Sequence, residues 1–270
     1  MVAVSLISNM PDTLLYILQL IVFAVASLLH GLTGMGFPMI GTIALAMLFP
    51  LPKAIAIMAF PSLIMNFIVL FTNNTRGVLG EVAYYSKKYW LLALTSLIGS
   101  VIGIKLLLYV PAGVVYILMA VITLYYVING YLSNKGIIKG LRIPTGAVSL
   151  MVFGSVAGIV GGATNAMSPI LMMYLFSNTN SKHEIVKASN ICYLLSKMVQ
   201  VIMLRDQILA FSSKELITLA ILTTASILFL FIGIKLRSRV SNAKFRNAIY
   251  LILLFLSIKV GYTGIEYFVS

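Results

Sequence analysis

Two short stretches of this sequence combine small, polar and proline residues inside apolar surroundings, a composition suited to a small-anion site. The first reads GLTGMGFPMIG over residues 31–41 and the second GGATNAMSPIL over residues 161–171. Small residues let a ligand approach the backbone, and proline fits a first helical turn because its missing N–H would be unpaired there. The free amides and the positive dipole end of the following helix favour an anion. The predicted anion-binding residues are Thr33, Gly34 and Gly36 in the first stretch and Thr164, Asn165 and Ser168 in the second.

Close helix packing would explain either stretch taken alone, because small residues let membrane helices approach one another. Two stretches at equivalent positions favour the anion site instead, since each is followed by an apolar segment too short to cross a bilayer. As helices, segments 37–50 and 167–177 would rise only about 21 and 17 Å, against a hydrocarbon core of about 30 Å.

Four further polar residues lie in or beside apolar segments. Lys197 is costly at the bilayer centre and either supplies charge to the anion or extends its amine to the membrane surface. Asn66 and Asn190 follow the two broken stretches and either line the transport path or bond between helices. His30 borders the first stretch and could titrate in a proton-coupled cycle. A hydrogen-bonded histidine between helices is the simpler interpretation of His30.

The composition indicates a multi-pass protein of the cell membrane. Of the 270 residues, 61% are hydrophobic and 9% are charged. A soluble domain of this composition would have too little polar surface to face water. The net charge of +13 does not indicate nucleic acid, because the basic residues lie between apolar runs. There they favour one membrane orientation and contact with anionic lipid headgroups.

We expect an all-α polytopic fold of two repeats, residues 1–140 and 141–270, each a re-entrant hairpin of broken helices followed by three transmembrane helices. The expected hairpins are 13–50 and 143–177, and the expected spans are 54–72, 89–110, 112–132, 186–204, 214–235 and 247–268. An offset of 131 residues aligns LTGMGFP with ATNAMSP, which pairs Thr33 with Thr164 and Pro38 with Pro169.

Basic residues determine the expected orientation, because Lys and Arg favour cytoplasmic loops. If each hairpin returns to its starting side, one side carries Arg76, Lys87, Lys88, Lys135, Lys139, Arg142, Lys182, Lys187, Lys235, Arg237, Arg239, Lys244 and Arg246. The other side carries Lys53, Lys105, Arg205 and Lys214. Both termini are then extracytoplasmic, and the second repeat is inverted relative to the first. Inverted repeats with broken helices are typical of secondary transporters that work by alternating access.

The sequence resembles the TauE/SafE family of sulfite exporters, also called the toluene-sulfonate uptake permease family. The resemblance rests on GLTGMGFPMIG, its partner GIVGGATNAMSPIL, and the helix starts KAIAIMAFPSLIMN and EIVKASNICYLLS. The GGATNAM stretch departs from the glycine-rich pattern that the family has at this position. The resemblance implies transport of sulfite, sulfonates or related small sulfur-containing anions.

A passive anion channel, or a transporter of another small carboxylate or inorganic anion, remains an alternative. An enzyme is not expected, because the only histidines are His30 and His183 and the six acidic residues lie at segment ends or in loops. The single cysteine, Cys192, adds little to a metal or nucleophile site. We therefore expect no catalytic residues, no metal and no cofactor.

Overall fold

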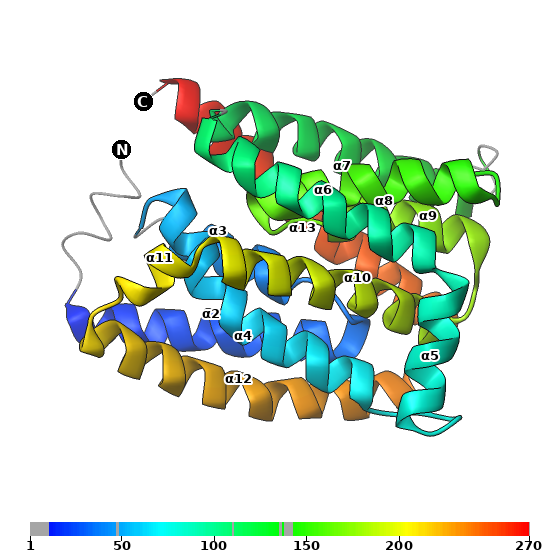
Figure 1. Ribbon diagram of the computed structural model, residues 1–270, viewed down its shortest axis with the longest axis horizontal. Helices are drawn as coiled ribbons and strands as arrows, with labels where there is room; N and C mark the ends of the chain where they lie inside the picture. Colours follow the sequence, from blue (N-terminus) through cyan, green and yellow to red (C-terminus); the bar gives the residue numbers. More distant parts are fainter. Residues whose placement is uncertain (1–10, 47–48, 110, 135–136, 138–142, 270) are drawn as a thin grey trace.

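The computed structural model describes residues 11–46, 49–109, 111–134, 137 and 143–269. Within these residues all regular secondary structure is helical (Figure 1). The helices are α2 (Asp12–Thr33), α3 (Phe37–Leu45), α4 (Leu51–Phe71), α5 (Val78–Lys88), α6 (Trp90–Tyr109), α7 (Ala112–Asn134), α8 (Ala147–Thr164), α9 (Ser168–Asn178), α10 (Lys182–Met203), α11 (Arg205–Leu209), α12 (Ser213–Arg239) and α13 (Asn242–Val269).

Eight helices of the described residues are long and apolar enough to cross a membrane. They are α2, α4, α6, α7, α8, α10, α12 and α13. The short helices α3 and α9, of 9 and 11 residues, occupy the two segments predicted to be too short. The predicted all-α polytopic fold is therefore confirmed. The sequence did not predict α5 and α11, which occupy expected loops.

The first broken segment is a break between two helices, and a positive φ angle causes it. α2 ends where Gly34 adopts a φ of 78°, and the Gly34 N–H bonds back to the His30 carbonyl at 2.7 Å. Gly36, with a φ of 102°, then begins α3, and Pro38 lies in its first turn. Glycine adopts positive φ values without a steric penalty, so these two positions need it.

The second broken segment is built in the same way. α8 ends at Asn165, whose φ of 64° places it in the left-handed region, and its N–H bonds to the Gly161 carbonyl at 2.9 Å. Asparagine is among the few residues besides glycine that adopt this conformation readily. Gly34 and Asn165 are equivalent under the 131-residue offset, and Pro169 follows in α9 as Pro38 follows in α3.

The helices pack in pairs whose members correspond under the repeat. α2 packs against α12 as α8 packs against α6, while α4 packs against α10 and α7 against α13. The first two pairs are in backbone contact, because a Cβ on Gly233 would collide with the Leu28 carbonyl oxygen and one on Gly103 with that of Ile159. The equal order and pairing of helices are what a duplication predicts. The inverted orientation of the second half remains a prediction.

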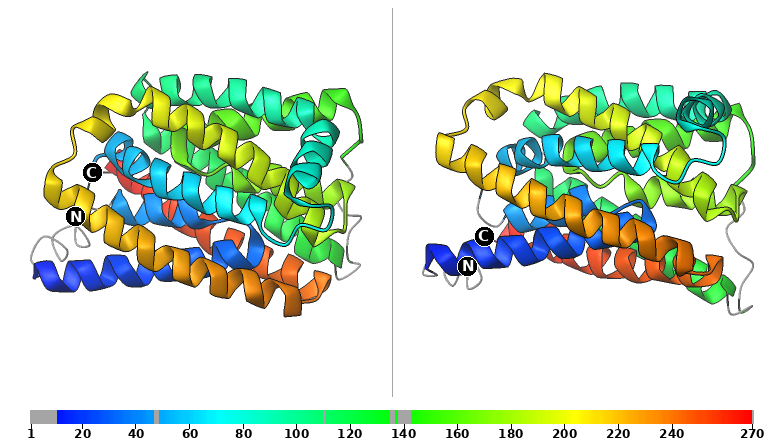
Figure 2. Two further views of the ribbon diagram at one scale, coloured as in Figure 1. Left: turned by 60° about the horizontal axis from the view of Figure 1, so that its bottom comes forward. Right: turned by 90° about the horizontal axis from the view of Figure 1, so that it is seen from below.

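The two ends of the molecule differ in charge. The first turn of α2 and the last turn of α13 lie at one end, whereas α5 and the connections α9–α10 and α12–α13 lie at the other (Figures 1 and 2). α2 and α4 both run toward the α5 end, so the chain between them must return, as the predicted hairpin requires. The α5 end carries the basic residues between 76 and 88, 182 and 187, and 235 and 246, most of them in the adjoining helix ends. Lys135, Lys139 and Arg142 lie outside the described residues.

Candidate functional site

A buried polar network surrounds the second break. The Asn165 Oδ1 accepts hydrogen bonds from the Lys197 ammonium and, at 2.8 Å, from Gln200 Nε2. The Asn165 amide nitrogen donates to Thr42 Oγ1 at 2.6 Å. Asn165 therefore connects the end of α8 to α10 and also to α3, which belongs to the first broken segment.

Lys197 is the charged group of this network, and its side chain is only 3% exposed. Besides Asn165, its ammonium donates to Gln200 Oε1 at 2.6 Å. No carboxylate of the described residues forms an ion pair with it. The expected alternative, in which the amine extends to the membrane surface, does not agree with this burial. A buried ammonium held only by neutral groups is a favourable partner for an anion.

A small cavity of about 10 Å³ adjoins Lys197. It is lined by Pro38, Gly161, Asn165, Met167, Ser168, Tyr193, Ser196 and Lys197. Both broken segments contribute to it, the first through Pro38 and the second through Asn165, Met167 and Ser168. This volume holds about one water molecule. An anion the size of sulfite therefore enters only if the two segments move apart.

The first break contacts α10 nearer to the N-terminus of that helix than Lys197. The Gly34 carbonyl accepts a hydrogen bond from Asn190 Nδ2 at 3.0 Å, and a Cβ on Gly34 would lie 2.9 Å from Val186. Asn190 and Lys197 are seven residues apart on α10, a rise of about 10 Å. The structure thus brings Asn165, Ser168 and Lys197 together at the cavity, but Gly34 contacts α10 about two helical turns away.

The other predicted residues of the breaks make local contacts. Thr33 Oγ1 donates to the Leu29 carbonyl at 2.7 Å, and Thr164 Oγ1 donates to the Val160 carbonyl at 2.7 Å. Gly36 faces side chains, since a Cβ there would lie 3.6 Å from Ile40. None of these three residues lines the small cavity.

His30 and Asn66 are fully buried beside the first break. His30 contacts the Asn66 side chain and the Met35 backbone, but neither contact is a well-formed hydrogen bond. The hydrogen-bonded histidine between helices therefore stays a prediction. Buried polar atoms without partners are rare in proteins.

The structure corrects the assignment of two basic residues to loops. Arg237 lies in the last turn of α12, is buried, and donates from Nε to the carbonyls of Gly31 at 2.9 Å and Leu32 at 3.2 Å. Lys187 lies in α10 and donates to the Leu70 and Thr72 carbonyls at 2.7 and 2.6 Å. These cations stabilise the carbonyl ends of α2 and α4, where the helix dipole is negative.

Sequence reasoning also missed Gln200 and Thr42. Gln200 donates to the Gly161 carbonyl at 3.2 Å and so holds the end of α8 as well as Lys197 and Asn165. Its spacing of three residues from Lys197 places both on one face of α10, which was the available signal. Thr42 carries no such signal, because only the folded chain brings it to Asn165.

A second polar cluster attaches α5 to the start of α10. The Glu81 carboxylate is 1% exposed, bonds to the His183 ring, and accepts a hydrogen bond from the Thr75 N–H at 2.6 Å. Burial by itself would raise the pKa of the Glu81 carboxyl, but the bonds from His183, Thr75 and Arg76 outweigh it and hold the pKa below its usual value. The ionised carboxylate is therefore the form that stabilises this contact.

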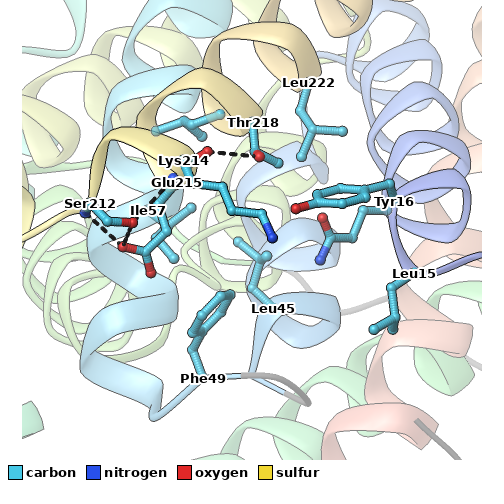
Figure 3. A pocket seen from close by; sticks show the side chains of 12 residues that line it. Leu15, Tyr16, Leu45, Phe49, Ile57, Ser212, Lys214, Glu215, Thr218 and Leu222 are labelled. Carbon is cyan, nitrogen blue, oxygen red and sulfur yellow. Dashed lines mark hydrogen bonds between the residues drawn. The ribbon is translucent and has the colours of Figure 1, made fainter. Parts of the chain in front are cut away.

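A larger cavity, of about 320 Å³, lies at the end of the molecule away from α5. Figure 3 shows the Lys214 side chain extending between Tyr16 and Leu45, in a lining that is mainly apolar. Lys214 belongs to α12, Tyr16 to α2 and Leu45 to the last turn of α3. The cavity contains none of the predicted site residues, and the nearby Glu215 carboxylate pairs with Lys53 at 2.6 Å. The small cavity at Lys197 is the better candidate site because both breaks reach it.

Eight candidate membrane-crossing helices and two broken segments beside a buried lysine define a polytopic membrane protein of the transporter class. The family model "Sulfite exporter TauE/SafE" matches residues 19–260, and the chain belongs to this family. Its members are transporters of sulfite and related anions rather than enzymes. Comparisons with curated proteins and with solved structures found no match. The described residues contain no group of three or more His, Cys, Asp or Glu side chains that could hold a metal ion.

Proposed function

We propose that the protein is a secondary transporter that moves a small sulfur-containing anion across the cell membrane by alternating access. The anion is sulfite, a sulfonate or a related organosulfur anion, and it binds between the two broken segments beside Lys197. Three residues that line the small cavity, Asn165, Ser168 and Lys197, are the proposed binding residues. Thr33, Gly34, Gly36, Thr164, Asn66 and Asn190 do not line the closed cavity, and we propose that they contact the anion once the two segments have moved apart.

The observation that carries this proposal is the environment of Lys197. A buried ammonium at the centre of a bilayer is costly, by about 2.5–3.5 kcal/mol or more. Asn165 and Gln200 offset part of this cost through hydrogen bonds, but neither is charged. An anion in the adjoining cavity would neutralise the ammonium and would also meet the first turn of α9, whose N-terminal residue Met167 provides no capping side chain.

Alternating access requires the closed cavity to open, first to one side and then to the other. The hydrogen bond between Asn165 and Thr42 joins the two broken segments directly, so it must break or rearrange when the anion enters. The Lys197 ammonium must likewise exchange Asn165 or Gln200 for the anion. The same side chains therefore close the empty site and bind the anion.

Orientation follows from the charge difference between the two ends. We propose that the α5 end is cytoplasmic, where its basic residues contact anionic lipid headgroups, and that both termini are extracytoplasmic. A nucleic-acid partner has no place in this proposal, because the basic residues lie between or within apolar helices, and those that the structure describes form no continuous basic surface domain. If transport is coupled to protons through a protein side chain, we propose His30 as that side chain.

A passive anion channel and a carrier of another small anion are the competing functions. A channel needs a continuous path, whereas the cavity at Lys197 is closed on the scale of one water molecule. A carboxylate or inorganic anion would satisfy the same lysine, so the ligand has to be tested directly.

The test is a thermal-shift titration of the purified protein with sulfite, short sulfonates and short carboxylates. A ligand that binds the native state raises the melting temperature. Lys197→Met is expected to abolish the rise with sulfite, because losing one partner of a buried charge pair costs about 2–5 kcal/mol of binding free energy. The control is Lys259→Met, which also removes a lysine from a helix but one that does not line the cavity.

An undiminished shift in Lys197→Met would remove Lys197 from the binding site. A shift with carboxylates but none with sulfite or sulfonates would contradict the assignment to sulfur-containing anions.

A further inference from the structure

The polar atoms around the first break are as informative as the lysine at the second. His30, Ser62, Asn66 and Asn190 are all fully buried. The Ser62 hydroxyl and the Asn190 Oδ1 form no hydrogen bond with the described residues, and the His30 ring contacts the Asn66 side chain and the Met35 backbone without a well-formed hydrogen bond to either. Each such atom costs about 1–3 kcal/mol when it is left unpaired. So many of them indicate a site that holds a polar ligand during part of the cycle.

His30, Asn66 and Asn190 lie around the first break. α4 and α10 pack together, and the Lys187 ammonium bonds to the Leu70 carbonyl at 2.7 Å, one turn from Asn190 and one turn from Asn66. The Asn190 amide bonds to the Gly34 carbonyl at the break. His30 lies next to Asn66.

The charge of the region favours an anion. The Arg237 guanidinium lies at the end of α2, on the carbonyls of Gly31 and Leu32. α3 begins at the break with Gly36 as its N-cap, which supplies no capping side chain. The His30 ring packs edge-on near Phe37, the first residue of α3, with 6.4 Å between ring centroids. A helix N-terminus, a buried guanidinium and unpaired polar side chains thus meet at one place.

The unpaired atoms include acceptors as well as donors. Asn66 Oδ1, Asn190 Oδ1 and one nitrogen of a neutral imidazole can only accept, while Ser62, the Asn66 amide and the other imidazole nitrogen donate. A fully deprotonated anion only accepts, so it would leave every one of these acceptors unpaired. An anion that keeps one O–H donates to an acceptor with that group and accepts from the donors with its charged oxygens.

Building on the proposed function, we propose that the first break is a second anion site, and that it takes the substrate as a protonated monoanion of the hydrogen-sulfite type. The anion O–H donates to His30, Asn66 or Asn190, and the charged oxygens face Ser62, the Asn66 amide and the start of α3. The proton then crosses with the anion. No side chain has to titrate for transport to be coupled to protons.

The experiment measures proton uptake on binding by isothermal titration calorimetry of the purified full-length protein. Titrations are run in buffers of different ionisation enthalpy, at mildly alkaline pH where sulfite is mostly a dianion. Methanesulfonate is the control ligand, because it has one charge and no O–H at any pH used. We expect binding of sulfite to take up about one proton per anion and binding of methanesulfonate to take up none.

Two variants locate the effect. His30→Phe keeps a ring but removes the acceptor, and we expect sulfite to bind at least roughly tenfold more weakly, with methanesulfonate affinity unchanged. His30→Gln keeps an acceptor and a donor, and it should restore much of the sulfite affinity. The expected pattern also needs both variants to melt as cooperatively as the unaltered protein.

The outcomes separate this inference from the proposed function. Sulfite binding without proton uptake, or equal uptake with methanesulfonate, would contradict the protonated-monoanion site while leaving sulfur-anion transport intact. Equal proton uptake with both ligands would mean that a protein group takes the proton. Failure of both anions to bind at all would instead overturn the proposed function.

Discussion

At the scale of single residues, Asn165 combines two roles that the sequence does not separate. Its backbone ends α8 in a left-handed conformation, and its side chain bonds to Thr42, Lys197 and Gln200. At the equivalent position in the first half, Gly34 performs only the backbone role. The departure from a purely glycine-rich pattern thus marks the place where the second break acquires its polar network.

Substitution of Asn165 should separate these roles. Asn165→Gly keeps the backbone conformation and removes the side-chain bonds, so we expect a folded protein with weaker sulfite binding. Asn165→Ala removes the same bonds and adds a left-handed strain of about 1–2 kcal/mol, so it should melt below the glycine variant. Melting curves of the two purified variants measure the difference. Identical melting temperatures would show that the positive φ at this position is not maintained.

Gln200 is the residue whose role can be tested most cleanly, because it positions the lysine without being charged. Gln200→Leu leaves the Gly161 carbonyl and the Lys197 ammonium each short of one partner. We expect a loss of about 1–3 kcal/mol of stability and weaker sulfite binding. The matched control is Gln19→Leu on α2, a residue that takes no part in the network's hydrogen bonds and does not line the small cavity. Sulfite affinity equal to that of the control would exclude Gln200 from the site.

At the scale of elements, helix pairs are held by glycine contacts that admit no side chain. Gly103→Ala places a methyl group against the Ile159 backbone, so α6 and α8 must separate. We expect a clear fall in melting temperature, since overpacking typically costs about 1–3 kcal/mol. Gly80→Ala on α5 is the control, because its added Cβ would have its nearest neighbour at 3.9 Å. Equal stability of both variants would contradict the close α6–α8 contact.

The attachment of α5 should depend on pH through Glu81. Because the folded protein holds the pKa of this carboxyl below its usual value, its contribution is fully present above the unfolded-state pKa of about 4.3. It is lost as the pH falls through the lower, folded-state pKa. Glu81→Gln removes it at all pH values, and hydrogen exchange of the α5 amides should then be faster at neutral pH.

The control for Glu81 is Asp206→Asn, because Asp206 and its partner Arg205 are both largely exposed. Such pairs contribute about 0–1 kcal/mol. Exchange in α5 that is equally slow in Glu81→Gln and in Asp206→Asn would show that this carboxylate does not hold the helix.

At the scale of the whole molecule, the sequence predicted the elements well and their contacts poorly. Lengths of apolar runs determine which helices can cross, and Gly34 and Pro38 determine where the first hairpin breaks. The sequence alone does not predict to which helix-end carbonyl a lysine or arginine far away in the chain will donate a hydrogen bond. Arg237 and Lys187 were therefore assigned to loops although both are buried.

The same limit applies to the candidate site. The sequence predicted one site shared by both breaks, and Asn165, Ser168 and Lys197 do line one cavity. Gly34 instead contacts α10 at Asn190, about two turns from Lys197. The distance between Asn190 and Lys197 along α10 follows from the sequence. Which residue of α10 each break contacts depends on how all the helices pack together.

Orientation can be tested by cysteine labelling, because the single native cysteine, Cys192, is buried. In a Cys192→Ser background, Leu209→Cys lies at the end opposite α5 and Lys244→Cys at the α5 end, both at exposed positions. A membrane-impermeant thiol reagent added to intact cells should label Leu209→Cys, and Lys244→Cys only after lysis. The reverse pattern would contradict the proposed cytoplasmic location of the basic end.

The most direct test of the account is counterflow in proteoliposomes. Vesicles containing the purified protein are loaded with unlabelled sulfite, and the entry of radiolabelled sulfite is followed. An alternating-access carrier predicts that loaded vesicles accumulate label transiently above equilibrium, and that Lys197→Met abolishes this overshoot while Lys259→Met does not. Entry of label that is indifferent to internal sulfite would contradict alternating access, since a passive channel gives no overshoot.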